Sequence, residues 1–402
     1  MRRATRWGAL VALLGAAVAI AALAATSGGR AASSAKKPVV IGWAYDLSGQ
    51  MAPFDNPALA AAKIRIKQIN AKGGAAGHKF VIKTCNTQNN SPSKAKSCAL
   101  SLLGGGADII FVTCDVDFAT PVVQEAIKRG KLAIAPCIGT DQMGPKRFSK
   151  QGKLAFSFGN VAQDEGSAMA EYAHRRGWKT ASLATNTLLV YFKNVVTAFD
   201  KRFTQLGGKI VTRQSYATGA NNVGNAVTQL NAKKADVIVS STSFGELPAL
   251  VSGLRALGNN TPVLNSWAGD GTYWVTQNPK ITNYYCVTYA SVFGDDPNKA
   301  VRAMIASLKK AGAAPGTGGF VGGAAAIDGV TLAIQRAHGS TKGSALAAQL
   351  VKFKKVQVLG GKISFSAQFH TVYGRQYRVI QIQNNKAKYV GAVTAKVIPK
   401  LY

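Results

Sequence analysis

Residues 39–45 have the sequence VVIGWAY, a short apolar run that opens a long alternation of two patterns. Short apolar runs of this kind are typical of buried strands, and the stretches between them carry apolar residues at helical spacing. Strand patterns recur at residues 79–84, 108–113 and 131–135, and helical patterns at about 57–70, 92–103 and 119–129. This alternation predicts right-handed crossover units and a mostly parallel sheet.

The alternation stops near Phe156 and then restarts, which predicts a second lobe of the same kind. Its strand patterns are residues 180–185, 209–214, 236–241 and 285–290, and its helical patterns are residues 164–175, 191–206 and 223–233. Further helices are expected at about 297–311, 319–337 and 342–353. From Gly360 the pattern changes to strands, with Asn384-Asn385 as a hairpin turn. The predicted fold class is therefore α/β, with two Rossmann-like lobes.

The first residues have the pattern of an export signal. Arg2, Arg3 and Arg6 precede an apolar stretch over residues 8–25, and Ala22-Leu23-Ala24 offers a small-x-small cleavage site. We expect residues 1–25 to be a signal peptide, so the chain is expected outside the cytoplasm. An uncleaved anchor is the rival reading, since 18 apolar residues just span a bilayer. No cysteine follows the stretch until Cys85, so no lipid anchor is indicated.

The chain is very basic, with 49 Lys and Arg against 17 Asp and Glu, a net charge of +32. The basic residues are scattered, without a basic arm or zinc finger, so nucleic-acid binding is not predicted. Two functional readings remain open: attraction to acidic cell-surface polymers, and steering of anionic solutes toward a cleft. A solvated basic surface is the structural alternative.

Five cysteines in a chain bound for an oxidising compartment predict disulfides. Cys85 ends a predicted strand and Cys98 lies on the helix that follows it, whereas Cys114 and Cys137 each end a strand of one sheet. We therefore expect the pairs Cys85–Cys98 and Cys114–Cys137, with Cys286 free. No short paired spacing suggests a metal site.

Motifs for catalysis are not found. The sequence has no G-x-S-x-G elbow, no Walker loop and no G-x-G-x-x-G, which argues against a serine hydrolase and against nucleotide chemistry. The histidines lie away from the predicted strand ends and are expected at the surface: His78, His174, His338 and His370. We therefore expect no enzyme and no cofactor, with a secreted hydrolase as the weaker alternative.

Several short stretches resemble the leucine/isoleucine/valine-binding proteins, which are type I periplasmic binding proteins of branched-chain amino-acid ABC transporters. The stretches are VIG at 40–42 leading into DLSG at 46–49, QINAKGG at 68–74, NSPSKA at 90–95, GGG at 104–106 and GGKISF at 360–365. The similarity covers nearly the whole mature chain.

The resemblance implies two lobes joined by three crossing segments, with one small polar solute held in the cleft between them and delivered to a membrane permease. The expected first lobe comprises residues 38–157 and 290–358, and the second comprises residues 158–289 and 359–402. A monomer in the periplasm or extracytoplasmic space is implied, not embedded in the membrane once processed. A ligand-sensing receptor of the same fold is the main alternative.

In such folds ligands bind beyond the carboxyl ends of the strands, so the candidate residues lie in the loops there. In the first lobe they are Ser48, Asp117, Phe118, Ala119, Gly139 and Thr140. Phe118-Ala119 is expected to open a helix with free backbone N–H groups, which in the family hold the ligand carboxylate. Single hydroxyl residues in such loops also serve as turns or caps.

In the second lobe the candidates are Tyr191, Phe244, Trp267 and Asp270. Relatives use an acid in the loop that corresponds to residues 266–271 to pair with the ligand ammonium. The resemblance therefore makes Asp270 the candidate, although Trp267 is an alternative for the position of that acid. Asp115 and Asp117 depart from the family's small, Ser-rich loop. Either they cap the next helix, or the ligand presents a neutral or cationic group to them.

Overall fold

The computed structural model describes residues 36–401, so the predicted signal peptide lies outside the described residues. The first sheet has the strand order β13-β5-β4-β3-β1-β2, and every neighbouring pair in it is parallel. Its strands are β1 (Lys36–Tyr45), β2 (His78–Asn86), β3 (Ile109–Phe111), β4 (Leu132–Ala135), β5 (Ala155–Asn160) and β13 (Thr371–Val372). Strands β3, β4 and β5 are buried along their whole length, as parallel strands covered on both faces should be.

The second sheet has the order β15-β14-β10-β9-β8-β6-β7. Five strands are parallel: β6 (Thr180–Asn186), β7 (Lys209–Tyr216), β8 (Val237–Ser241), β9 (Val263–Asn265) and β10 (Tyr284–Thr288). Strands β14 (Tyr377–Gln383) and β15 (Lys386–Val393) add to it as an antiparallel hairpin. Asn384 and Asn385 have φ of 49° and 64°, which confirms the predicted turn.

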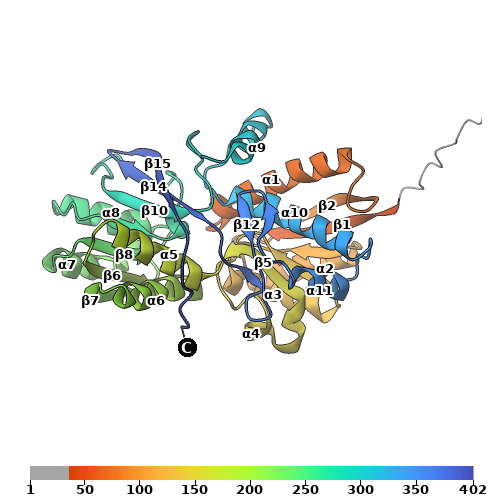
Figure 1. Ribbon diagram of the computed structural model, residues 1–402, viewed down its shortest axis with the longest axis horizontal. Coiled ribbons are helices and arrows are strands. Elements are labelled where there is room, and N and C mark those ends of the chain that lie inside the picture. Colours follow the sequence, from red (N-terminus) through yellow and green to blue (C-terminus); the bar gives the residue numbers. More distant parts are fainter. Residues whose placement is uncertain (1–35, 402) are drawn as a thin grey trace, which may run out of the picture. The chain divides into compact units, whose positions relative to one another are not determined.

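Helices cover both sheets (Figure 1). Around the first sheet, α1 (Ala52–Ala71) packs on α10 (Phe320–Arg336), and α2 (Pro92–Gly104) packs on α3 (Val116–Lys128). Around the second sheet, α5 (Ala162–Arg175) packs on α6 (Val190–Gln205), and α7 (Gly224–Ala232) on α8 (Glu246–Ala256). The remaining elements are α4 (Pro145–Phe148), α9 (Lys299–Lys310), α11 (Gly343–Leu350), the small hairpin β11 (Val356–Val358) with β12 (Gly361–Ile363), and three short 3-10 helices, 149–154, 220–222 and 267–269.

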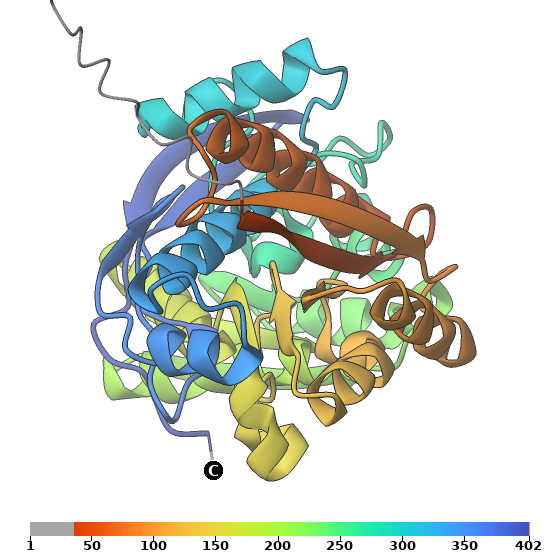
Figure 2. The same cartoon turned by 90° about the vertical axis from the view of Figure 1, so that its right-hand side faces the viewer.

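Helices α1 and α10 lie side by side (Figure 2), and their close approach depends on one glycine. A Cβ added at Gly323 would lie 1.9 Å from the backbone oxygen of Ala58. Only glycine lets the two helix backbones come this close. The α10 sequence is accordingly apolar and rich in small residues, and most of it is buried.

The chain passes between the two sheets three times: after β5, after β10 and after β13. This agrees with the predicted fold class of two α/β lobes. One detail differs from the predicted lobe boundaries, because β13 pairs with β5 in the first sheet although residues from 359 onward were expected in the second lobe. The other boundaries stay a prediction.

Both expected disulfides are present, Cys85–Cys98 and Cys114–Cys137, and Cys286 is a buried free cysteine. The expectation that every histidine lies at the surface is wrong for His370. This residue is 5% exposed, and its ring stacks on Phe156 at 4.1 Å between centroids. Within residues 36–401, none of the helices combines the length and apolar character needed to cross a bilayer.

Candidate functional site

Aromatic side chains from both lobes meet in one small pocket. Phe54 comes from the first turn of α1 in the first lobe, whereas Tyr191, Phe244 and Trp267 come from loops and a helix start in the second. The other lining residues are Met51, Cys114, Asp115, Leu189, Phe192, Ser243 and Ala268. These positions follow the carboxyl ends of the strands, as the sequence predicted. The cavity volume is about 20 Å³, which is room for about one water molecule, so the lobes are closed on each other.

A row of three aromatic rings, of which Trp267 and Tyr289 are stacked, crosses this interface. The Phe54 ring lies 4.9 Å from the Trp267 ring, and Trp267 lies 5.0 Å from Tyr289 with an angle of 7° between the two planes. Phe54 belongs to the first lobe and Trp267 to the second, while Tyr289 lies just after β10 on a crossing segment. Opening of the cleft must therefore separate Phe54 from Trp267.

Glu165 is the acid that organises the second-lobe wall of the pocket. It is fully buried in the first turn of α5, where its Oε1 accepts the backbone N–H of Trp267 at 2.6 Å and its Oε2 accepts the Tyr191 hydroxyl at 2.9 Å. Burial raises the pKa of Glu165 to about 8, although the two hydrogen bonds act in the opposite direction and lower it. Sequence reasoning missed Glu165. The signal available was an acid in the first helical turn beside the predicted lobe crossing.

Gly139 of the first lobe lies close against the ring of Tyr191 from the second. A Cβ at this position would lie 2.6 Å from Tyr191 Cε2, so the ring occupies the space that any side chain would need. The neighbouring Thr140 is buried, and its hydroxyl accepts the N–H of Gln142 at 3.3 Å, as in a local turn. Ser48 is exposed and does not line the pocket.

The two acids of the β3–α3 loop have different partners. Asp115 caps α3, accepting the N–H of Asp117 at 2.8 Å and that of Phe118 at 3.4 Å, which confirms the capping interpretation for this residue. Burial and the neighbouring Asp117 raise the pKa of Asp115 to about 7. The expectation of free N–H groups at Phe118 and Ala119 is wrong. Helix α3 begins earlier, at Val116, and the Ala119 N–H donates to the backbone oxygen of Asp115.

Asp117 links the two lobes. Its Oδ1 pairs with Arg147 Nη2 at 2.5 Å within the first lobe, and its Oδ2 accepts the N–H of Val190, the first residue of α6 in the second lobe, at 3.3 Å. A carboxylate at a helix N-terminus is electrostatically favourable. Asp117 therefore holds the closed arrangement and is already charge-paired.

Asp270 is buried but lies outside the pocket lining. Its carboxylate accepts three hydrogen bonds, from Gly271 N at 2.8 Å, from the Thr288 hydroxyl at 2.6 Å and from Gly318 N at 2.5 Å. Burial raises its pKa to about 6 despite these bonds. Gly318 precedes α10, so Asp270 also joins the lobes. Its expected role as the partner of a ligand ammonium stays a prediction.

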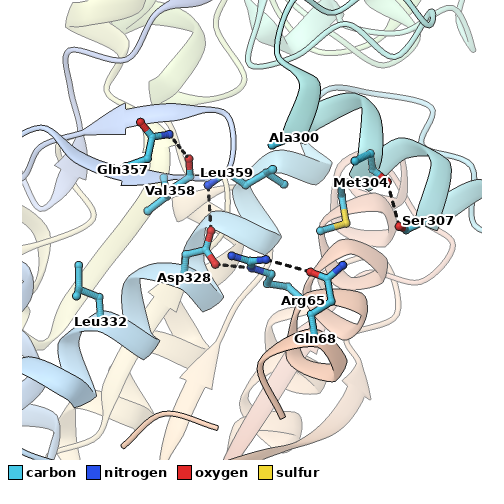
Figure 3. A pocket seen from close by; sticks show the side chains of 11 residues that line it. Arg65, Gln68, Ala300, Met304, Ser307, Asp328, Leu332, Gln357, Val358 and Leu359 are labelled. Atoms are coloured by element: carbon cyan, nitrogen blue, oxygen red, sulfur yellow. Dashed lines mark hydrogen bonds and ion pairs between the residues drawn. The ribbon is translucent and has the colours of Figure 1, made fainter. Parts of the chain in front are cut away.

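A larger groove lies on the first lobe, between α1, α9, α10 and the β11–β12 hairpin (Figure 3). Its cavity volume is about 550 Å³. Arg65 Nε pairs with Asp328 Oδ1 at 2.5 Å across its floor, and Asp328 Oδ2 accepts the N–H of Leu359. The charges in this groove thus satisfy each other, whereas the interlobe pocket brings both lobes to one site.

Comparison with known proteins gives a consistent answer. The family model described as periplasmic binding protein matches residues 38–387. The Leu/Ile/Val-binding protein homolog 3 of Brucella melitensis is 24% identical over 346 residues, which cover 86% of this chain and 91% of that protein.

Among solved structures, LivJ from Streptococcus pneumoniae in complex with isoleucine has a TM-score of 0.74 at 20% identity, over 88% of this chain and 99% of that one. A solute-binding protein from Rhodopseudomonas palustris in complex with benzoate has a TM-score of 0.74 at 18% identity, over 90% and 98%. These structural similarities establish the fold.

Proposed function

Because this chain belongs to the periplasmic binding protein family, we propose that it binds one small organic solute between its lobes, leaves it chemically unchanged, and delivers it to the permease of an ABC transporter. Export signal and family together support a monomer that acts outside the cytoplasm. The observation that carries the proposal is the convergence of Phe54 from one lobe with Tyr191, Phe244 and Trp267 from the other on a single pocket.

The pocket supports a solute with an apolar body. Its walls are mainly aromatic and aliphatic, with few exposed polar atoms, and ring faces accept both apolar groups and cations. Similar proteins hold isoleucine and benzoate, which are both small carboxylic acids. We therefore propose an aliphatic or aromatic amino acid, or an aromatic acid, as the ligand class.

The charge of the exposed surface supports an anionic group on the solute. Of the 17 acidic residues, which all lie in the described part, only Asp236 and Asp295 are exposed, whereas most lysines and arginines are exposed. Such a surface raises the local concentration of anions and speeds their encounter with a cleft.

Ligand entry requires the lobes to part, since a cavity of about 20 Å³ holds no amino acid. Opening separates Phe54 from Trp267 and breaks the hydrogen bond from Val190 to Asp117. Closure around the solute then replaces these contacts with contacts to the ligand. Every polar group of the buried ligand must find a partner in the closed state.

A thermal-shift screen tests the proposal. Leucine, isoleucine, valine, phenylalanine and benzoate are offered to the wild-type protein, with glucose as an unrelated solute. A true ligand raises the melting temperature in a concentration-dependent way, and chromatography of the mixture should recover it unchanged. If none of these acids shifts the transition, or if one is converted, the proposed ligand class or the proposed binding role is wrong.

A matched pair of tryptophans locates the site. Trp267 lines the pocket, whereas Trp274 is equally buried in a separate apolar cluster of the second lobe. Replacing Trp267 by Leu should weaken the affinity for the identified ligand by about 10- to 100-fold, since aromatic contacts at a binding site contribute on the order of 1–3 kcal/mol. Replacing Trp274 by Leu should lower stability alone. Equal affinities in the two variants would remove Trp267 from the site.

A further inference from the structure

Arg375 is a buried cation whose guanidinium lacks a hydrogen-bond partner. It lies on the third crossing segment, between β13 and β14, with 0% exposure, and within residues 36–401 none of its three side-chain nitrogens has a partner. The two other buried arginines are satisfied: Arg255 donates to the backbone oxygen of Thr282 at 3.0 Å, and Arg378 pairs with Asp296 at 3.2 Å. A buried unpaired charge is costly, so Arg375 needs a partner.

The surroundings of Arg375 come from all three crossing segments. Its guanidinium carbon lies 5.2 Å from the centre of the Tyr289 ring, on the second crossing. Asn160, where the first crossing begins, donates its backbone N–H to the Tyr289 hydroxyl at 3.1 Å. The Asn160 side-chain amide is buried here as well, and the Tyr377 hydroxyl lies beside it. We name Arg375, Asn160 and Tyr289 the hinge cluster.

The neighbouring acid, Asp164, attracts Arg375 without forming an ion pair with it, and among the described residues its Oδ1 also lacks a hydrogen-bond partner. Asp164 Oδ2 is occupied by the Gly374 N–H at 3.3 Å and the Tyr377 hydroxyl at 3.4 Å, and no ion pair joins Asp164 to Arg375 in the described part of the chain. Burial raises the pKa of Asp164 to about 7, which further reduces its negative charge near neutral pH. The cluster therefore keeps an excess of positive charge.

We propose that the hinge cluster binds one small monoanion, a chloride ion or a single carboxylate group, through the guanidinium of Arg375 and the side-chain amide of Asn160. The available groups are rich in donors, because a guanidinium offers five N–H groups and an amide two, against one amide oxygen and the Oδ1 of Asp164. An anion complements both the excess charge and this donor set.

The anion site differs from the proposed solute pocket and does not depend on it. Two stacked rings, Trp267 and Tyr289, stand between the pocket and Arg375. Because the cluster draws on all three crossing segments, a bound anion would hold these segments together at the hinge. Anion binding should therefore stabilise the protein whether or not the solute is present.

Thermal unfolding in two salts at equal ionic strength tests the proposal. Sodium chloride is exchanged stepwise for sodium gluconate, whose anion is too large for a buried cluster. The melting temperature should rise with chloride concentration and then follow the logarithmic dependence of a single bound ligand. Equal melting temperatures in the two salts would exclude chloride as the occupant. If formate also gave no stabilisation, water rather than an anion would solvate Arg375, and the proposal would be overturned.

Two variants assign the effect to the cluster. Arg375→Met should abolish the difference between chloride and gluconate, and in gluconate it should be at least as stable as the wild type, since an unpaired buried charge is removed. Arg255→Met removes a buried arginine whose hydrogen bonds are satisfied, so it should lose stability and retain the chloride effect. A chloride effect that persists in Arg375→Met would overturn the assignment.

If the Arg375→Met variant fails to fold, the anion can still be located directly in the wild-type protein. Wild-type crystals soaked in sodium bromide should show an anomalous scattering peak within hydrogen-bond distance of Arg375. Sodium formate distinguishes the two sources of the anion: stabilisation by formate equal to that by chloride indicates a carboxylate site, and stabilisation by chloride alone indicates a halide site. No peak beside Arg375, together with no stabilisation by either salt, contradicts the proposal.

Discussion

Replacement of Gly139 by Ala should hold the cleft open. The added Cβ would lie 2.6 Å from Tyr191 Cε2, far inside van der Waals contact. Tyr191 cannot easily turn away, because its hydroxyl is bonded to Glu165 at 2.9 Å and its ring packs on Phe192. Gly139 and Tyr191 belong to different lobes, so this severe clash exists only in the closed state. Within the first lobe the Cβ would meet the Asn160 backbone oxygen at 3.1 Å, a milder crowding that the open and closed states share.

Overpacking of a tight contact costs about 1–3 kcal/mol. Because this free-energy cost falls on the closed, ligand-binding state, it should weaken ligand affinity by about 5- to 150-fold. Titration calorimetry with the amino acid that gives the largest thermal shift measures the loss, and small-angle scattering should show a larger radius of gyration for the variant than for the wild type in the absence of ligand.

The matched control is Gly245→Ala at the start of α8. A Cβ there meets nothing closer than Ala220 Cβ at 3.9 Å, and φ is −69°, which alanine adopts readily. This variant should bind and scatter like the wild type. The reasoning is refuted if Gly139→Ala keeps both the affinity and the radius of gyration of the wild type.

Three further substitutions have defined outcomes. The pKa of Glu165 is raised from 4.5 to about 8 in the folded state, so its contribution to stability is present at low pH and is lost as pH rises toward 8. Glu165→Gln should therefore flatten the decline between pH 5 and 9 and be the more stable protein at pH 9, by up to on the order of 5 kcal/mol in urea unfolding; an unchanged slope would contradict this. Asp270→Ala leaves three buried donors unpaired and should cost about 2–4 kcal/mol of unfolding free energy, whereas a loss of ligand affinity at full stability would restore Asp270 to the binding site. Asp117→Asn weakens the ion pair with Arg147 and the acceptor for Val190, so the unliganded protein should open more often, seen as faster hydrogen exchange at the Val190 amide, and unchanged exchange would argue against the link.

Much of the fold could be predicted because its elements carry local signals. The turn at Asn384-Asn385 needs residues that tolerate positive φ. The disulfides join cysteines at the ends of predicted strands, except for Cys98, which lies on a predicted helix. Several elements were not predicted, among them α4, β5, β9 and α8. Strand β9 has only three residues, too few to show a period, whereas α8 has buried Leu247, Leu250, Val251 and Leu254 at helical spacing, so its signal was available.

The site was harder to predict because it depends on contacts between lobes. Tyr191, Phe244 and Trp267 were expected in the cleft loops and do line one pocket. Phe54 ends one of the expected first-lobe loops but was not singled out, and Glu165 was not expected at the site. A short loop sequence does not reveal which of its polar groups will form hydrogen bonds within the protein and so be unavailable to a ligand. Asp270 is an example, since its oxygens accept hydrogen bonds from residues as distant in sequence as Gly318.

The threefold passage of the chain between its sheets has a consequence for biogenesis. Strand β13 adds to the first sheet only at Thr371–Val372, and the hairpin of β14 and β15 adds to the second sheet later still. Neither sheet can therefore reach its full strand complement until almost the entire polypeptide has left the ribosome. Late completion of this kind suits a precursor that has to be threaded through a narrow translocation channel before it acquires its tertiary structure.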